Sequence, residues 1–217
     1  MPGGLRPWPL VLVALLLALL ILRSTSSPAA PGWWRNLPSL IWQRPRPERL
    51  LYLACALSFA MLALQILPLP PTGVDSLGYH LLGPVAWVQE GRFVPLETYW
   101  DWANSYPQNV EVLSALALAF FPHLRAADLP NLLFLALLFG SIAVIARHFA
   151  GHPFAIALAC LSLLLSPFVI AYASATYCDL PMAAALLASL ALLLTARRTH
   201  DWPAVWWALV AAGLAAG

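Results

Sequence analysis

Long apolar runs separated by short polar breaks dominate the pattern of residues along this chain. A helix needs about 20 mostly apolar residues to cross the roughly 30 Å hydrocarbon core of a bilayer. Several runs reach or approach that length: residues 8–22, 50–69, 129–146, 154–172, 180–196 and a last run that begins at Trp202. The pattern therefore predicts an all-α fold, a polytopic bundle of transmembrane helices.

Two shorter apolar patterns follow the run at 50–69. Residues 109–121 begin with polar side chains and form only a short run, which indicates an interfacial or re-entrant helix. Between residues 76 and 89, apolar side chains recur at helical spacing, which predicts an amphipathic helix on the membrane surface. They are Leu77, Leu81, Val85 and Val88. Asp75 would cap the start of this helix.

Arginines near the ends of the runs predict the orientation, because cytoplasmic loops carry an excess of positive charge. Arg35, Arg44, Arg46 and Arg49 crowd the segment before residue 50, which makes that segment cytoplasmic and the following loop, 70–108, external. If residues 109–121 do not span, Arg147 and the pair Arg197 and Arg198 are cytoplasmic as well. The loop 173–179 is then external, so Asp75 and Asp179 share one face.

Composition supports a multi-pass membrane protein, and we expect it in the plasma (inner) membrane with its active face external or periplasmic. Hydrophobic residues make up 62% of the chain, charged residues 9%, and the mean hydropathy is +0.80. Soluble domains carry about 25% charged residues. The net charge of +2 is small and the arginines cluster between apolar runs, so no nucleic-acid partner is expected. Cys55, Cys160 and Cys178 show neither a disulfide framework nor metal-ligand spacing.

The first and the last apolar runs lie outside the predicted transmembrane core. Residues 8–22, preceded by Arg6 and followed by small residues, fit either an anchor helix or a signal peptide. Cleavage would leave the arginine-rich segment outside, so residues 1–49 are interpreted as an uncleaved anchor and an Arg/Trp-rich cytoplasmic linker. Residues 50–196 form the transmembrane core. Residues 197–217 start a further helix, and we expect the chain to be the N-terminal part of a longer protein.

Polar side chains that could carry chemistry concentrate in the external loops. Asp75 and Asp179 each directly precede an apolar helix, where an aspartate is often a simple N-cap. A serine or asparagine would cap without placing charge near hydrocarbon, where an ionised side chain costs roughly 2.5 to 3.5 kcal/mol at the bilayer centre. Both carboxylates are therefore candidate functional groups. The other candidates nearby are Tyr79, His80, Arg92, Asn104, Tyr106, Glu111 and Tyr177.

Three short motifs occur in a distinctive order: Asp75-Ser-Leu-Gly-Tyr-His-Leu, Pro107-Gln-Asn-Val-Glu111 and Tyr177-Cys-Asp179-Leu-Pro. Over roughly residues 50–196 the chain resembles the N-terminal half of GT-C membrane glycosyltransferases. The resemblance is to the branch that uses dolichyl- or polyprenyl-phosphate sugars, such as protein O-mannosyltransferases and lipid A aminoarabinose transferases. It implies an essential aspartate in the first external loop, juxtamembrane helices, and another acidic residue in the second external loop.

The resemblance implies a transferase that moves a hexosyl or pentosyl group from a polyprenyl-phosphate donor to a hydroxyl of a protein, lipid or glycan acceptor. Asp75 would be the base of an inverting displacement, and Asp179 would hold hydroxyls or support Asp75. His80 and Arg92 would meet the phosphate. Glu111 and Asn104 would line the acceptor groove, and the tyrosines (Tyr79, Tyr106, Tyr177) would contact substrate. The segment alone is expected to be inactive.

One departure from the family pattern and two alternatives accompany this interpretation. Many family members carry a second acidic residue where this chain has Ser76, so a paired-acid metal site is not predicted there. The carboxylates and His80 could hold a divalent cation, but no ligand spacing indicates one. A transporter would favour charges within helix interiors, which here are nearly free of them. A non-catalytic assembly protein would leave the two aspartates as caps.

Overall fold

A computed structural model describes residues 43, 45–66, 70–99, 101–104, 108–149 and 152–216. In this part of the chain every regular element is a helix. The predicted anchor or signal peptide at 8–22, most of the linker that follows it, and Tyr106 lie outside the described residues. The prediction of an all-α fold is confirmed for the residues that the structure covers.

Three long helices form the apolar bundle: α3 (Arg46–Ile66), α6 (Leu129–Phe149) and α9 (Asp179–Thr199). Each has 21 residues, and a 3-10 turn, η4 (Leu124–Asp128), leads into α6. At 1.5 Å per residue each helix is about 30 Å long, enough to cross a bilayer core. The described part of the chain thus has three apolar helices long enough to cross a membrane, or four if a bent pair forms one span.

The bent pair corrects the prediction of one continuous helix at 154–172. The structure has α7 (Pro153–Leu164) and α8 (Pro167–Ala173), which meet at an angle of 61°. Pro167 has no N–H to donate, and its ring would clash with the carbonyl one turn earlier, so α7 ends before it. The amide of Ser166 instead donates to the Leu163 carbonyl at 3.0 Å.

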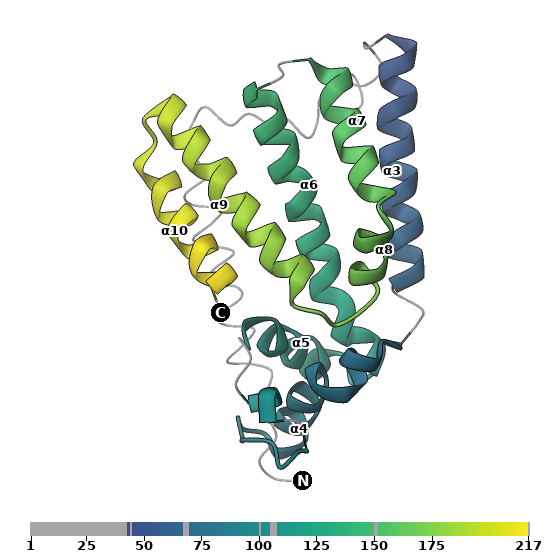
Figure 1. Cartoon of the computed structure of the whole chain (residues 1–217), viewed down its shortest axis with the longest axis vertical. Helices are drawn as coiled ribbons and strands as arrows, with labels where there is room; N and C mark the ends of the chain where they lie inside the picture. Colours follow the sequence, from purple (N-terminus) through teal and green to yellow (C-terminus); the bar gives the residue numbers. More distant parts are fainter. Residues whose placement is uncertain are drawn as a thin grey trace.

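The long helices pack around a core near one end of the bundle. Leu62 and Ile66 of α3 meet Leu135 and Leu138 of α6, with Leu164 of α7 beside them. Helix α9 lies along α6 on one side and along α10 (Trp202–Ala216) on the other (Figure 1). Buried alanines recur on both α9 and α10, and such small side chains let helix backbones approach closely.

Short helices gather at the lower end of the bundle in Figure 1. They are a π-helical turn η2 (Ser76–His80), α4 (Leu82–Glu90), a 3-10 turn η3 (Asp101–Asn104) and α5 (Asn109–Phe120). The predicted amphipathic helix is thus divided in two, with a bond from the Leu81 amide to the Ser76 carbonyl closing the π turn. Helix α5 is about 18 Å long, too short to span, as predicted.

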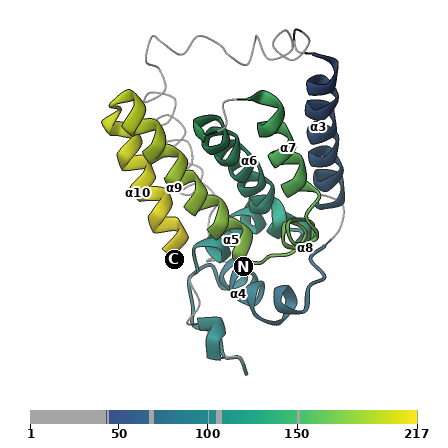
Figure 2. The same cartoon turned by 45° about the horizontal axis from the view of Figure 1, so that its top comes forward.

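The arginines that flank the long helices lie at one end of the bundle, and Asp75 and Asp179 lie at the other. Arg46 and Arg49 begin α3, Arg147 ends α6, and Arg197 and Arg198 end α9. The other ends of these helices meet the short helices, and Asp75 and Asp179 lie there (Figures 1 and 2). The two aspartates therefore share one end, as the arginines predicted. That this end is external remains a prediction.

This orientation is testable with cysteines at two exposed positions, Thr72→Cys near the acidic end and Asp201→Cys beyond α9. The background carries serine in place of Cys55, Cys160 and Cys178. A membrane-impermeant maleimide added to sealed cells is expected to label position 72, and position 201 only after permeabilisation, because positive charge stays inside. Labelling of both positions in sealed cells would contradict a bundle that spans the membrane. Labelling of position 201 alone in sealed cells would show that the orientation is opposite to the predicted one.

Candidate functional site

Two loops 100 residues apart in sequence meet at the acidic end of the bundle. The buried Ser76 hydroxyl accepts a 3.1 Å hydrogen bond from the Thr176 amide. At Gly73 the Tyr177 hydroxyl comes so close that a Cβ placed there would lie 2.8 Å from it. The segment before η2 and the segment before α9 therefore form one surface.

Tyr177 joins the two candidate carboxylates on this surface. Its hydroxyl lies against Gly73, two residues before Asp75, and Tyr177 itself stands two residues before Asp179. Burial, followed by the charges of Asp75 and Asp179, raises the pKa of Tyr177 above its usual range. The phenol thus stays protonated at physiological pH and can donate a hydrogen bond. Asp75 and Asp179 themselves are exposed, so both remain accessible to a ligand that binds at Tyr177.

Neither aspartate acts as a side-chain cap. Asp75 precedes η2 with helical backbone angles of φ −70° and ψ −35°, and its side chain makes no capping bond. The prediction that Asp75 caps the following helix is therefore wrong. Asp179 is already the first residue of α9, after Cys178, which also makes no side-chain capping bond. Helix capping therefore does not explain these two carboxylates, although their negative charge still suits a helix N-terminus.

A buried pair lies beside Tyr177. His80 Nδ1 and Glu111 Oε1 are 2.6 Å apart, and the two residues are only 4% and 7% exposed. The His80 ring lies between the Tyr79 ring, with centroids 4.3 Å apart, and the Tyr177 ring, at 5.8 Å. The second carboxylate oxygen of Glu111 is buried and has no hydrogen-bond partner. Sequence reasoning named both residues for different roles and did not foresee this pairing.

Cys178 is the functional group that sequence reasoning set aside. Burial, followed by the charges of Asp179 and Glu111, raises the pKa of this half-buried thiol to about 11. Burial first, and these two charges next, therefore keep the thiol protonated at physiological pH.

Buried polar side chains on α5 and α6 hydrogen-bond to backbone carbonyls close to this surface. The Asn131 amide on α6 donates to the carbonyls of Ala175 and Tyr172. Ser114 on α5 donates to the Ala127 carbonyl at 2.9 Å. Three buried oxygens here have no partner: Glu111 Oε2, Asp128 Oδ1 and Thr176 Oγ1. Such groups are rare in folded proteins and commonly mark a bound water or a functional site.

The other predicted site residues stand apart from this cluster or outside the described chain. Arg92 is exposed just beyond α4. Both amide atoms of the Asn104 side chain bond to the backbone of Leu96, at 2.7 and 2.9 Å, so Asn104 closes its own loop. Tyr106 is not described. No group of three His, Cys, Asp or Glu side chains among the described residues could hold a metal ion.

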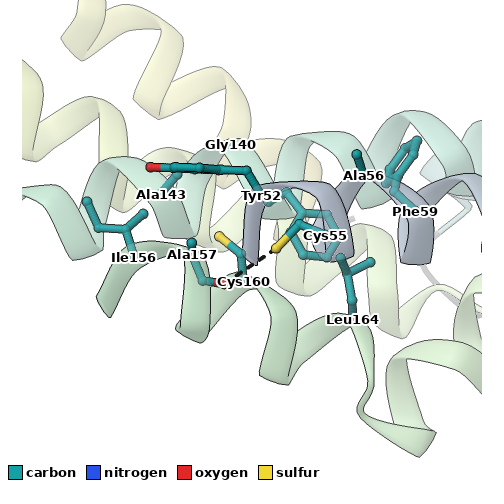
Figure 3. A pocket seen from close by; sticks show the side chains of 11 residues that line it. Tyr52, Cys55, Ala56, Phe59, Gly140, Ala143, Ile156, Ala157, Cys160 and Leu164 are labelled. Carbon is teal, nitrogen blue, oxygen red and sulfur yellow. Dashed lines mark hydrogen bonds between the residues drawn. The ribbon is translucent and has the colours of Figure 1, made fainter. Parts of the chain in front are cut away.

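A separate cleft lies between α3, α6 and α7 (Figure 3). Its volume is about 330 Å³, and its walls are apolar apart from Tyr52, Cys55 and Cys160. Cys55 Sγ donates a weak bond to the Ala157 carbonyl at 3.4 Å. None of the residues that line the cleft belongs to the carboxylate cluster, so the cleft takes no part in it.

Comparison of the chain with protein-family models, curated proteins and solved structures found no match. The function therefore has to be inferred from the side chains that converge around Tyr177.

Gly73 and Gly78 provide a matched test of the close contact between residue 73 and the Tyr177 hydroxyl. Gly73→Ala would place its Cβ against the Tyr177 hydroxyl, whereas Gly78 has no atom within 4 Å of its Cβ position. We expect Gly73→Ala to lower the free energy of unfolding by about 1 to 3 kcal/mol, as overpacking does, and Gly78→Ala to leave it unchanged or slightly raised. Unfolding in detergent measures both. Equal values for the two variants would contradict the contact.

The Cys178 thiol provides a pH test in a variant that retains only this cysteine. A pKa of about 11 leaves about one thiol in a thousand ionised at pH 8. Alkylation is therefore expected to be slow and to accelerate tenfold per pH unit up to pH 10, because the thiolate is the reactive form. Asp179→Asn should raise the rate at pH 8 severalfold by removing a negative charge. A rate that levels off below pH 9 would contradict this environment.

Proposed function

We propose that this chain is part of a membrane glycosyltransferase of the GT-C type, which transfers a sugar from a polyprenyl-phosphate donor to a hydroxyl acceptor at the external face. The observation that supports the proposal is that the two segments carrying Asp75 and Asp179 meet at one end of an apolar bundle, through the Thr176–Ser76 hydrogen bond and the Tyr177 hydroxyl at Gly73. Exposed carboxylates beside hydrocarbon suit a reaction between a lipid-borne donor and an acceptor from the aqueous phase.

The chemistry needs a base, a site for the leaving phosphate, and alignment of the reactants. Asp75 takes the proton of the acceptor hydroxyl. The acceptor oxygen then bonds to the anomeric carbon as the bond from that carbon to the phosphate oxygen breaks, and the electron pair leaves with the lipid phosphate. Attack from the face opposite the phosphate inverts the anomeric configuration.

Tyr177 and Asp179 suit the binding of the donor. The Tyr177 phenol, kept protonated by its surroundings, donates a hydrogen bond to a sugar or phosphate oxygen. Asp179 accepts hydrogen bonds from sugar hydroxyls. His80, next to Tyr177, supplies a donor toward the phosphate. The arrangement divides the site into a proton-accepting part at Asp75 and a binding part around Tyr177.

One observation favours a transporter as the second candidate. Asp128, at the start of the apolar segment Leu124–Phe149, is 1% exposed and keeps one oxygen without a partner. Buried carboxylates at membrane depth often serve proton or ion pathways. Asp75 and Asp179, by contrast, lie at the bundle end and in contact with solvent, which favours the transferase.

Transfer of labelled sugar from polyprenyl-phosphate donors, measured with the full-length protein in membranes, tests the proposal. We expect Asp75→Asn to lower transfer at least a hundredfold, since positioned bases contribute about 10² to 10⁴ in rate. Asp179→Asn is expected to lower it about tenfold, chiefly through KM, because a lost hydrogen bond to a charged group costs about 1.5 kcal/mol or more.

Glu97→Gln is the matched control, because Glu97 is an exposed carboxylate in the same loop. It should transfer sugar as the wild type does. Undiminished transfer in Asp75→Asn, at matched expression and with intact folding, would remove Asp75 as the base. No transfer by the wild type from any donor, together with substrate flux that depends on Asp128, would favour the transporter.

A further inference from the structure

A second cavity with charged walls lies where α9 turns into α10, at the end of α9 opposite Asp179. Its volume is about 340 Å³. The side chains that line it come from the last turns of α9, the two-residue connection and the first turn of α10: Leu193, Ala196, Arg197, His200, Asp201, Trp202 and Val205. On α9 these positions recur at spacings of three and four, so they share one face of the helix. The cavity therefore lies between the two helices and combines apolar residues with the charged residues of the turn.

The cavity lies at the level where the bundle meets the lipid headgroups. Helix α9 is long and apolar enough to cross a membrane, and it ends at Thr199, beside the cavity. Trp202 and Trp206 are 76% and 71% exposed, and indole rings favour the membrane–water interface. The turn from α9 to α10 lies at the upper end of the bundle in Figure 1, as does the arginine-bearing start of α3. Membrane lipids can therefore reach this cavity.

The polar groups around the cavity can pair with charges of both signs. Arg197 is a cation with several N–H donors, and His200 has at least one N–H in either of its protonation states. Asp201 contributes a carboxylate, and the exposed ring of Trp202 next to it attracts ammonium groups. Within the described part of the chain, the side chains of Arg197 and Asp201 form no hydrogen bond or ion pair. Partners for an anion and for a cation are thus available in one cavity.

Ordinary roles at helix ends explain these residues only in part. Arg197 suits the negative end of the α9 dipole, but so does Arg198, which does not line the cavity. Asp201 precedes α10, yet the bond that begins this helix runs from the Ala204 amide to the Asp201 backbone carbonyl, at 3.2 Å. His200 has left-handed backbone angles, φ 54° and ψ 33°, which glycine adopts most easily at a helix end. A histidine therefore stands where glycine would be less strained.

We propose that this cavity binds the headgroup of a zwitterionic phospholipid that carries a primary ammonium group, as phosphatidylethanolamine does. Arg197 and His200 donate hydrogen bonds to the phosphate, as basic pockets between membrane helices do for lipid headgroups. The Asp201 carboxylate accepts hydrogen bonds from the ammonium group beside the Trp202 ring. The apolar residues of the cavity contact the acyl chains. An anionic lipid without the ammonium group leaves Asp201 facing negative charge, which disfavours that lipid.

This inference is independent of the proposed sugar transfer, because it needs only a bundle that lies in a membrane. Native mass spectrometry of the full-length protein in detergent tests it, with phosphatidylethanolamine, phosphatidylglycerol and free phosphoethanolamine titrated in separate arms. We expect the wild type to bind phosphatidylethanolamine severalfold more tightly than phosphatidylglycerol, since only the former pairs with Asp201. The free headgroup should bind more weakly than the lipid, because it lacks the chains that bury apolar surface.

Substitutions of the charged residues separate the two halves of the headgroup. Arg197→Gln should weaken binding of both lipids about tenfold, because a hydrogen bond between charged groups is lost. Asp201→Asn should weaken binding of phosphatidylethanolamine and strengthen that of phosphatidylglycerol, so the preference reverses, a gain that misfolding cannot produce. Arg198→Gln is the matched control, because it removes the same charge from the same exposed helix end outside the cavity. It should bind both lipids as the wild type does.

His200→Gly separates binding from folding at the turn. Because glycine relieves the left-handed backbone, this variant should unfold at the same temperature as the wild type or a higher one, yet bind both lipids severalfold more weakly.

Several outcomes would overturn the proposal. Wild-type affinity in Arg197→Gln, equal losses in Arg197→Gln and Arg198→Gln, or an unchanged preference in Asp201→Asn would each refute headgroup binding in this cavity. Tighter binding of phosphatidylglycerol by the wild type would refute recognition of the ammonium group. Free phosphoethanolamine bound as tightly as the lipid would refute a membrane lipid as the ligand.

Discussion

The hydrogen bond from the Thr176 amide to the Ser76 hydroxyl is the contact on which the candidate site depends. It joins two loops that are 100 residues apart, and both partners are buried. A buried amide without a partner costs about 1 to 3 kcal/mol, so the loops have a strong reason to stay together. Asp75 directly precedes Ser76, and Tyr177 directly follows Thr176. One contact therefore determines which polar side chains can meet.

The packing of the short helices against one another also determines which side chains meet in the candidate site. Leu81, Leu118, Ala126 and Ala127 form a small core separate from that of the long helices. This core holds η2, α4 and α5 together at the acidic end, so that Glu111 on α5 reaches His80 on η2. The chemistry is thus carried by a compact layer on the end of the bundle. Such a layer can keep charged groups close to hydrocarbon without placing them inside it.

The apolar runs predicted the long helices well, because the length needed to cross a bilayer leaves few alternatives. The shared end of Asp75 and Asp179 followed from the arginines alone. The bend between α7 and α8 was missed, although Pro167 was visible in the sequence, because a long apolar run outweighed one helix-breaking residue. The pairing of His80 with Glu111 could not be predicted, since it depends on how α5 rotates against η2, which no local pattern records.

The close approach of the Tyr177 hydroxyl to Gly73 has a consequence for recognising this arrangement elsewhere. Position 73 leaves no room for a side chain, and both partners of the contact stand two residues before an aspartate, in Gly73-Val-Asp75 and Tyr177-Cys-Asp179. A chain that builds the same surface needs glycine-x-aspartate after one apolar helix and tyrosine-x-aspartate before a later one. This pair of tripeptides is a steric signature, independent of overall sequence similarity.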